Sequence, residues 1–207
     1  QFSSLSTVII INEKYDNTQR FGIPDDEFIR VDKVPMTKSE VRAITLSKLQ
    51  LNNNSIIYDI GAGTGSVSIE LALNAPDGKV YAIEQNENAI TAIGENKLIF
   101  QADNIEIIHG MAPEAMKDLP APTHVFVGGS LGKLSYIIAD ALKKNVNTRF
   151  VVNCVTMETV NEVMEIIKEF KFTEIVQVNV SKSKKLGNYN LLVANNPVFI
   201  ITFSGQK

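Results

Sequence analysis

Residues 56–72 of the chain read Ile-Ile-Tyr-Asp-Ile-Gly-Ala-Gly-Thr-Gly-Ser-Val-Ser-Ile-Glu-Leu-Ala. A short apolar, β-branched run leads into glycines at alternate positions, Gly61, Gly63 and Gly65, and an amphipathic pattern follows. The stretch therefore predicts a strand, a tight turn and a helix, which together begin a β-α-β unit. Glycine lets the backbone turn sharply and lets a ligand come close, while the N–H groups that open the helix are free donors. We expect this turn to bind a nucleotide-like ligand.

A second acidic position fits the same unit. Residues 79–84 read Lys-Val-Tyr-Ala-Ile-Glu, which predicts a strand that ends in an acid. Glu84 follows Gly63 by twenty-one positions, where such units place a carboxylate that accepts hydrogen bonds from ribose hydroxyls. A solvated glutamate at a strand end is the structural alternative. The spacing favours a ligand whose ribose carries no 2′-phosphate.

The acid that precedes the glycines narrows the type of ligand. The pattern Asp-x-Gly-x-Gly-x-Gly, which starts at Asp59, resembles the first motif of class I methyltransferases that use S-adenosyl-L-methionine. The third glycine of a dinucleotide-binding fingerprint would fall at Ser66, so a nicotinamide oxidoreductase is the weakest alternative. In class I methyltransferases the acid lies near the methionine moiety. The resemblance implies cofactor contacts by Asp59, Gly61, Ala62, Gly63, Thr64, Gly65 and Glu84.

The resemblance also implies the fold class. We expect an α/β chain with a doubly wound, mostly parallel seven-stranded sheet, Rossmann-like, and an antiparallel edge strand. Apolar runs predict further strands at 104–110, 124–127, 150–155, 173–180 and 197–203. The last two are consistent with an antiparallel hairpin at the edge of the sheet. Periodic patterns predict further helices at 88–100, 135–144 and 159–170.

A helix start is predicted ahead of the glycine turn. Thr37 is followed three residues later by Glu40, which predicts a capping box at the start of a helix. The helix should end at the three asparagines of residues 52–54. A cap needs no further function, but we also expect Thr37 to contact the cofactor.

Four short motifs narrow the resemblance further. They are Gly-Ile-Pro-Asp-Asp-Glu-Phe (22–28), Pro-Met-Thr-Lys-Ser-Glu-Val-Arg (35–42), the glycine motif (59–70) and Gly-Met-Ala-Pro-Glu-Ala (110–115). In this order and spacing they resemble the decarboxylating precorrin methyltransferases of cobalamin biosynthesis. The similarity runs from about Gly22 to the end of the chain.

This family resemblance implies an activity and an assembly. The expected enzyme methylates carbon 15 of a precorrin tetrapyrrole and decarboxylates its ring C acetate side chain. It would be a cytoplasmic homo-oligomer, often a tetramer, with Met111 and Ala112 beside the adenine ring of the cofactor.

The resemblance also divides the chain. In some organisms the enzyme is fused behind a tetrapyrrole methylase that acts at carbon 5. Residues 1–20 would then be a linker or the tail of that domain, and residues 21–207 the methyltransferase domain. A tag remnant or an added strand explains residues 1–20 equally well.

The exit of the strand at 124–127 is the expected acceptor side. Class I enzymes that methylate base amino groups usually carry Asp/Asn-Pro-Pro-Tyr here, but this chain has Gly128, Gly129 and Ser130. The two glycines would leave an open turn beside the methyl group, which suits a large planar acceptor. The same glycines are also explained if they only permit the turn. We expect His109 and His124 to be structural.

A basic run lies between the last two predicted strands. Residues 181–190 should form a long loop, in which Lys182, Lys184 and Lys185 would meet the carboxylates of an anionic tetrapyrrole. Simple solvation of these charges is the alternative.

Composition limits the remaining possibilities. The 207 residues are 44% hydrophobic and carry a net charge of −3, which provides a substantial core but no bulk attraction to nucleic acid or anionic membranes. The single cysteine, Cys154, lies in an apolar run and indicates a buried thiol in a reducing compartment. Two histidines and one cysteine far apart do not match the ligand spacing of a zinc site, so we expect no metal. No apolar run is long enough to span a membrane.

Other functions share the glycine turn and Glu84. A class I methyltransferase that acts on tRNA or on protein is one alternative, and a cofactor-binding domain that only assists a fused methylase is another. Retention on heparin or tRNA at low salt would support a methyltransferase that acts on tRNA. Cofactor binding without methyl transfer identifies the second.

Overall fold

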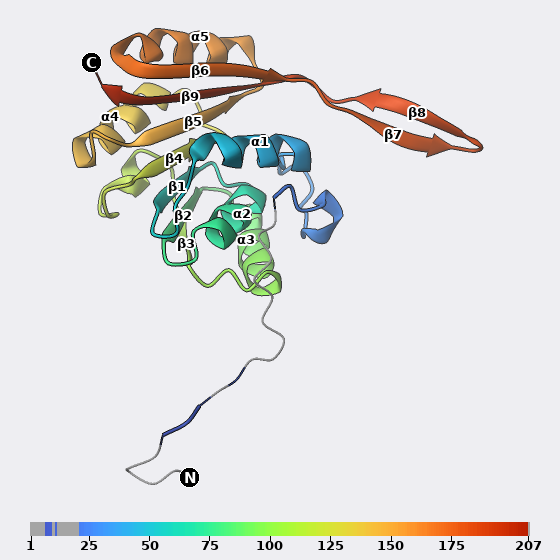
Figure 1. Cartoon of the computed structure of the whole chain (residues 1–207), viewed down its shortest axis with the longest axis horizontal. Helices are drawn as coiled ribbons and strands as arrows, with labels where there is room; N and C mark the ends of the chain where they lie inside the picture. The colour runs from blue at the N-terminus through green and yellow to red at the C-terminus, as the bar shows by residue number, and fades with distance from the viewer. Residues whose placement is uncertain (1–6, 10, 12–20, 207) are drawn as a thin grey trace.

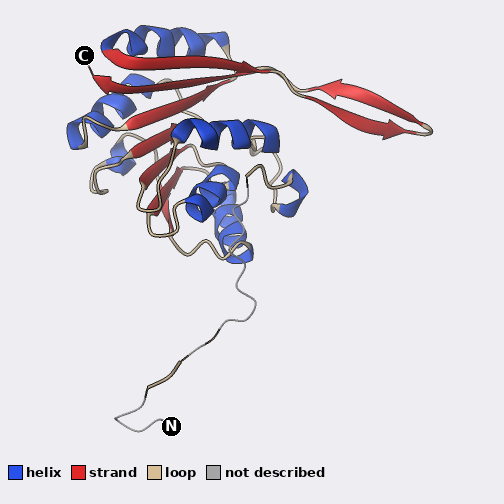
Figure 2. Ribbon diagram, viewed as in Figure 1, coloured by secondary structure: helices blue, strands red, loops and turns tan. Residues whose placement is uncertain are grey.

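A seven-stranded sheet with helices on both faces forms the body of the protein (Figures 1 and 2). The computed structural model describes residues 7–9, 11 and 21–206, so the predicted extension over residues 1–20 lies almost entirely outside the described residues. The sheet strands are β1 (Ile56–Ile60), β2 (Lys79–Glu84), β3 (Ile105–His109), β4 (His124–Val127), β5 (Arg149–Cys154), β6 (Phe170–Val178) and β9 (Val198–Gln206). Their order in the sheet is β3-β2-β1-β4-β5-β9-β6. This doubly wound order confirms the predicted fold class.

The helices divide between the two faces of the sheet. They are α1 (Ser39–Leu49), α2 (Ser66–Asn74), α3 (Glu87–Ile99), α4 (Leu134–Lys144) and α5 (Met157–Ile166), with short 3-10 turns η1 (Asp25–Glu27), η2 (Glu114–Met116) and η3 (Ile167–Glu169). Buried side chains of α1, α2 and α3 share one core cluster, whereas those of α4 and α5 share the other. Among the helices of the described residues, none combines the length and apolar character that crossing a membrane requires.

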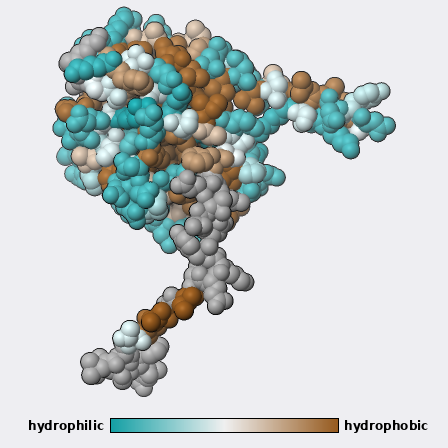
Figure 3. All heavy atoms as spheres, in the orientation of Figure 1, coloured by the Kyte–Doolittle hydropathy of each residue, from teal (hydrophilic) through white to brown (hydrophobic). Residues whose placement is uncertain are grey.

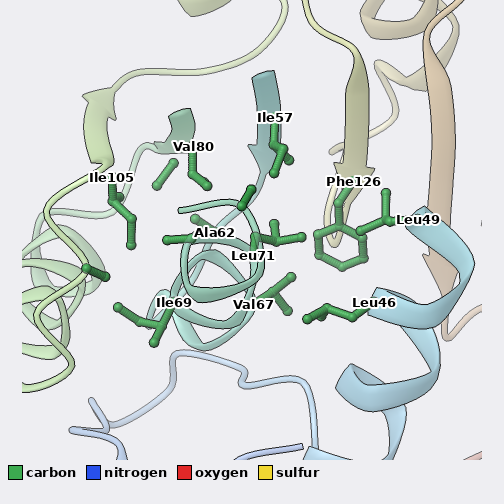
Figure 4. Close-up of a cluster of buried hydrophobic side chains, with 14 of the residues drawn as sticks. Leu46, Leu49, Ile57, Ala62, Val67, Ile69, Leu71, Val80, Ile105 and Phe126 are labelled. Atoms are coloured by element: carbon green, nitrogen blue, oxygen red, sulfur yellow. The ribbon is translucent and has the colours of Figure 1, made fainter. Parts of the chain in front are cut away.

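Successive side chains of β1 point to opposite faces of the sheet and so contribute to both hydrophobic cores. Ile57 points into the cluster under α1 and α2, and Tyr58 points into the cluster under α4. Figure 4 shows the first cluster, in which Leu71 and Phe126 lie between the helices and the strands. Both side chains are buried, and burial of each contributes about 1.5–3 kcal/mol. Strands buried on both faces read as continuous apolar runs, which is why the sequence predicts them well.

The sequence predicted an antiparallel strand at the edge of the sheet, but in the structure the antiparallel strand β9 lies one place inside the edge. β9 pairs antiparallel with β5 on one side and with β6 on the other, so β6 is the edge strand. The predicted antiparallel pairing of the last two sheet strands is correct. Their position differs because β9 returns into the gap beside β5, where both of its edges find partners.

The predicted loop over residues 181–190 is instead part of a β-hairpin. β7 (Ser181–Leu186) and β8 (Tyr189–Ala194) project from the body (Figure 1), and within the described residues they pair only with each other. The turn is Gly187-Asn188, and Gly187 has a φ of 59°. A glycine-asparagine pair between two short strands is a hairpin signal that the interpretation as a charged loop overlooked.

The start of α1 also differs from the predicted capping box. The helix begins at Ser39, and the side chains of Thr37 and Lys38 make no cap hydrogen bond. Instead, Asp25 Oδ1 accepts a hydrogen bond from the Ser39 amide at 3.0 Å. A carboxylate from η1 therefore takes the place that the sequence assigned to the Thr37 hydroxyl, and Glu40 pairs with Lys182 at 2.8 Å.

The boundaries of α5 were predicted too late in the chain. The helix ends at Ile166, where η3 takes over, and Thr156 caps its start by accepting from the Thr159 amide. Val163 is buried as predicted, but Met164 is 39% exposed and packs only partly into the core.

Candidate functional site

The glycine turn after β1 is enclosed by two other segments. Gly61 and Gly63 have φ angles of 72° and 57°, which side chains rarely adopt. A Cβ at Gly61 would lie 2.8 Å from the carbonyl oxygen of Gly129, in the loop after β4. A Cβ at Gly63 would lie 2.9 Å from the carbonyl oxygen of Pro35, ahead of α1. The glycines therefore allow close packing, and they keep the turn open to a ligand.

We call residues 21–38 the strap, because they cross the helices α1, α2 and α3 before α1 begins. Glu70 on α2 accepts hydrogen bonds from the amides of Gly22 and Ile23 at 2.8 and 2.9 Å. Asn96 on α3 bonds both the amide and the carbonyl of Ile29. Since Asp25 caps α1, the strap is attached to three helices at separate points.

A pocket of about 330 Å³ lies between the strap, the glycine turn and the exits of β2, β3 and β4. Parallel strands end at the same edge of a sheet, so residues distant in the sequence meet here. The wall combines backbone of the glycine turn with apolar side chains and a few polar ones. Its members outside the glycine turn include Lys33, Val34, Pro35, Thr37, Glu84, Met111, Ala112, Gly128, Gly129, Ser130 and Leu131.

Glu84 reaches from the end of β2 to the glycine turn. Its Oε2 accepts a hydrogen bond from the Gly63 amide at 2.9 Å. Its Oε1 accepts from the amides of Gln85 and Asn86 at 2.8 and 2.9 Å. A carboxylate has about four acceptor sites, so these three bonds orient Glu84 and leave Oε2 able to accept from a ligand in the pocket.

Asp59 lies at the base of the pocket and is fully buried. Its Oδ2 accepts a hydrogen bond from the Ser68 hydroxyl, and Oδ1 has no hydrogen-bond partner among the described residues. Burial is the main cause that raises the pKa of Asp59 to about 7; the Ser68 hydroxyl opposes this shift and the nearby charge of Glu84 adds to it. An unpartnered buried carboxylate oxygen in a pocket wall is suited to a cationic or donor group of a ligand.

Most of the predicted cofactor residues meet at this pocket. Thr64 and Gly65 do not line it, although they belong to the glycine motif. The Thr64 carbonyl instead accepts from Asn96, and a Cβ on Gly65 would lie 3.1 Å from Ile93, so both face α3. Gly65 thus serves the packing of the helix against the sheet.

The predicted acceptor residues separate into two groups. Gly128, Gly129 and Ser130 line the pocket beside the glycine turn. Lys182, Lys184 and Lys185 lie on β7 and do not line it.

Neither histidine lines the pocket. His109 ends β3 on the exposed side, where its ring lies 3.2 Å from the Gln85 carbonyl. Burial lowers the pKa of His124 to about 4, with a further contribution from Arg149, so its ring is neutral at physiological pH. Both positions fit the expected structural role.

Sequence reasoning missed Lys33, Val34 and Leu131 as pocket residues. Lys33 and Val34 lie between two of the quoted motifs, and Leu131 directly follows Ser130. No local spacing links the strap to the glycine turn, so only the folded chain reveals that they meet.

Comparison with known proteins agrees with the four sequence motifs. Residues 27–204 match the precorrin methyltransferase domain family. The chain is similar to cobalt-precorrin-6B C(15)-methyltransferase (decarboxylating) of Salmonella typhimurium, with 39% identity over 186 residues that cover 88% of this chain and 96% of that protein.

Two crystal structures are similar along nearly their whole length. For precorrin-6y C5,15-methyltransferase from Geobacter metallireducens the TM-score is 0.83 and the identity 39%, with coverage of 92% of this chain and 99% of that one. For precorrin 8W decarboxylase from Methanobacterium thermoautotrophicum the TM-score is 0.82 and the identity 34%, with coverage of 88% and 99%. These similarities confirm the family predicted from the sequence.

Proposed function

The chain belongs to the precorrin methyltransferase family, and from this premise we propose that it methylates carbon 15 of cobalt-precorrin-6B and removes the carboxylate of the ring C acetate side chain. The methyl donor would be S-adenosyl-L-methionine. One observation carries the proposal: a single pocket is lined by Asp59, Glu84 and Met111–Ala112 on the cofactor side and by an open glycine loop on the other.

The polar groups of the pocket fit the three parts of this cofactor. The unpartnered Oδ1 of Asp59 would accept from the ammonium of the methionine moiety, which a carboxylate binds well. Glu84 would accept from the ribose hydroxyls, a role supported by its bond to the Gly63 amide. Met111 and Ala112 offer an apolar surface and backbone groups to the adenine ring. When bound, the cofactor supplies an electrophilic methyl group on its sulfonium.

The residues of the chain then have to position the acceptor and exclude water. Methyl transfer is an in-line displacement, which needs the reacting carbon about 3–3.5 Å from the methyl group. The loop of Gly128, Gly129 and Ser130 leaves room for a planar macrocycle to approach that group. The conjugated ring can act as nucleophile and as electron sink for decarboxylation, so no protein nucleophile is required. A drier environment around the reacting acetate would favour loss of carbon dioxide.

We also propose a homo-oligomer, with a tetramer as the expected form. Support comes from the β7–β8 hairpin, whose apolar side chains Leu186, Leu191, Leu192 and Val193 are exposed in the single chain. In Figure 3 the projecting hairpin carries hydrophobic patches among hydrophilic ones. A second copy of the chain would cover them. Light scattering after gel filtration tests the assembly, and a monomer at micromolar concentration would contradict it.

Two measurements, made one after the other, test the proposed activity. Calorimetry should detect micromolar binding of S-adenosylhomocysteine and none of NAD. An assay with cobalt-precorrin-6B should then give one methylated product and one carbon dioxide per turnover, and the metal-free substrate compared in parallel shows whether cobalt is required. Cofactor binding without turnover of either tetrapyrrole would refute the proposed reaction and support a non-catalytic domain.

A further inference from the structure

Two residues on the wall of the pocket share an uncommon backbone conformation. Lys33 in the strap and Leu131 in the loop after β4 have φ angles of 63° and 50°. Non-glycine residues rarely adopt positive φ, and such strain gathers at ligand sites. The two segments flank the glycine turn, because Pro35 abuts Gly63 and Gly129 abuts Gly61. Lys33 and Leu131 therefore border the pocket from its two sides.

Lys33 is the one cationic residue on the pocket wall of the described chain, and three other lysines show the contrast with a paired charge. Lys38 pairs with Asp25 at 3.7 Å, Lys133 with Glu114 at 3.0 Å, and Lys182 with Glu40 at 2.8 Å. For Lys33, by contrast, no carboxylate within the described part of the chain lies within ion-pair distance. A pocket wall with one uncompensated cation favours an anionic group at that point.

The position of Lys33 is fixed despite its exposure. The Val34 amide donates to the Val31 carbonyl at 3.2 Å and closes the turn that carries Lys33. Earlier in the strap, Asn96 holds Ile29 through both its amide and its carbonyl. The lysine thus starts from an ordered backbone, which lowers the entropy lost when it binds a ligand.

Leu131 is one of several exposed apolar residues that follow the ends of β4 and β5. Its side chain is 68% exposed although it lines the pocket. Val127 pairs with Val152, so the exits of β4 and β5 are neighbours, and the exit of β5 carries Val155 and Met157, both largely exposed. An acceptor that extends beyond the pocket past these strand ends has exposed apolar side chains to pack against.

We propose that Lys33 and Leu131 seat the acceptor: Lys33 binds a carboxylate of the substrate, and Leu131 packs against the face of its macrocycle. The inference rests on the proposed function, because it takes the acceptor to be a polycarboxylate tetrapyrrole. Such a molecule combines a large apolar face with peripheral anions, which matches a pocket with a cation on one side and an exposed apolar side chain on the other. The assignment makes Lys33 and Leu131 specificity-determining residues for the acceptor, separate from the groups that face the cofactor.

Steady-state kinetics with cobalt-precorrin-6B tests the assignment. Lys33→Gln should raise KM for the tetrapyrrole about tenfold, as expected for loss of one charge-assisted hydrogen bond, with kcat within about twofold of wild type. Lys33→Arg should restore most of the affinity, since it keeps the charge. The difference between wild type and Lys33→Gln should shrink as potassium chloride is added. Leu131→Asn, which suits a positive φ, should raise KM severalfold with no such salt dependence.

Lys171→Gln on edge strand β6 is the matched control, because Lys171 is exposed and does not line the pocket. An unchanged KM in Lys33→Gln overturns the assignment. It is overturned as well if Lys33→Gln weakens S-adenosylhomocysteine in calorimetry as much as it weakens the tetrapyrrole, since Lys33 would then be a cofactor residue. Failure of the proposed function is visible separately, because the wild-type chain would then show no turnover.

Discussion

Arg42 Nε lies 2.8 Å from Glu70 Oε1, and neither side chain reaches solvent. The guanidinium also donates to the carbonyl oxygens of Ile23 and Thr37 and pairs with Asp25 at 2.9 Å. Because Glu70 in turn accepts from strap amides, this ion pair joins α1, α2 and the strap. The strap, which forms one wall of the pocket, is thus held by buried charge.

Removing one partner of this pair should destabilise the protein strongly. Glu70→Gln keeps the shape but leaves Asp25 as the remaining carboxylate partner of the buried Arg42 charge, so urea unfolding should show a loss of about 3 kcal/mol, the lower end for a broken buried ion pair. Asp140→Asn is the control, because Asp140 forms an exposed pair with Lys143 and its loss should change stability by less than about 1 kcal/mol. If the two variants were equally stable, Glu70 would not anchor the strap.

Asp59 should make the stability of the cofactor-free protein fall as pH rises. Its pKa is about 7 when folded and near 3.8 when unfolded, so between these values only the folded state holds the proton. Stability therefore decreases from about pH 4 to about pH 7, with a slope of at most about 1.4 kcal/mol per pH unit from this group. Above that window the contribution is constant.

Asp59→Asn isolates this effect from other titrating groups. Urea unfolding of variant and wild type at a series of pH values should give a stability difference that moves in favour of the variant up to about pH 7. Parallel profiles would show that Asp59 titrates near its ordinary pKa.

Glu84→Ala should weaken S-adenosylhomocysteine by about 1–3 kcal/mol, because it removes acceptors for the ribose hydroxyls. Calorimetry measures the affinity, and a melting curve without ligand shows whether loss of the bonds to Gly63, Gln85 and Asn86 unfolds the turn. Glu106→Ala on β3, an exposed partner of Lys79, is the matched control. Unchanged affinity in a folded Glu84→Ala variant rules out the ribose contact.

Two glycine substitutions should act in opposite directions. Gly63→Ala places a Cβ 2.9 Å from the Pro35 carbonyl at a φ of 57°, so stability should fall by more than about 1 kcal/mol and cofactor affinity should fall with it. Gly94→Ala, in α3 with open space around the added Cβ, should raise stability by about 0.4–1 kcal/mol. Thermal unfolding compares the stability of both variants. If Gly63→Ala left the stability unchanged, the strap at Pro35 would have moved to make room for the added Cβ.

The basic residues of β7 should act on the tetrapyrrole alone. Replacing Lys182, Lys184 and Lys185 together by Gln should raise KM for the acceptor and leave the affinity for S-adenosylhomocysteine unchanged. Lys182 pairs with Glu40, so Lys182→Gln alone separates loss of that pair from loss of the exposed charges. Unchanged kinetics in the triple variant would assign the run to solvation.

Local spacing was sufficient for the part of the site built by one β-α-β unit. Gly63 and Glu84 follow from the geometry of a strand, a turn and a second strand, whereas Asp59 was indicated by the resemblance to the class I methyltransferase motif. The structure brings all three to one pocket. The strap was not predictable in the same way, because its contacts join residues far apart in the chain, such as Ile23 and Glu70. The prediction of the residue that caps α1 was wrong for this reason: the sequence indicated Thr37, but in the folded chain Asp25 accepts the hydrogen bond from the Ser39 amide.

The last third of the chain shows a second limit. Strands buried on both faces gave clear apolar runs, whereas β7 and β8 are exposed along their whole length and carry no alternation of buried and exposed positions. Without a buried face, the pattern of charges resembled a loop. The order of β9 and β6 was also undetermined, since the sequence predicts pairing but not which strand takes the inner place.

The inner place of β9 has a consequence for how the chain is made. Residues 198–206 come after all the other strands in the sequence, yet in the sheet they lie between β5 and β6. On the ribosome, β6 has no neighbour to pair with until these residues emerge, so both β5 and β6 expose unpaired edges to other nascent chains. The sheet is therefore completed only when β9 is made, and a chain whose synthesis stops before residue 198 keeps both edges unpaired.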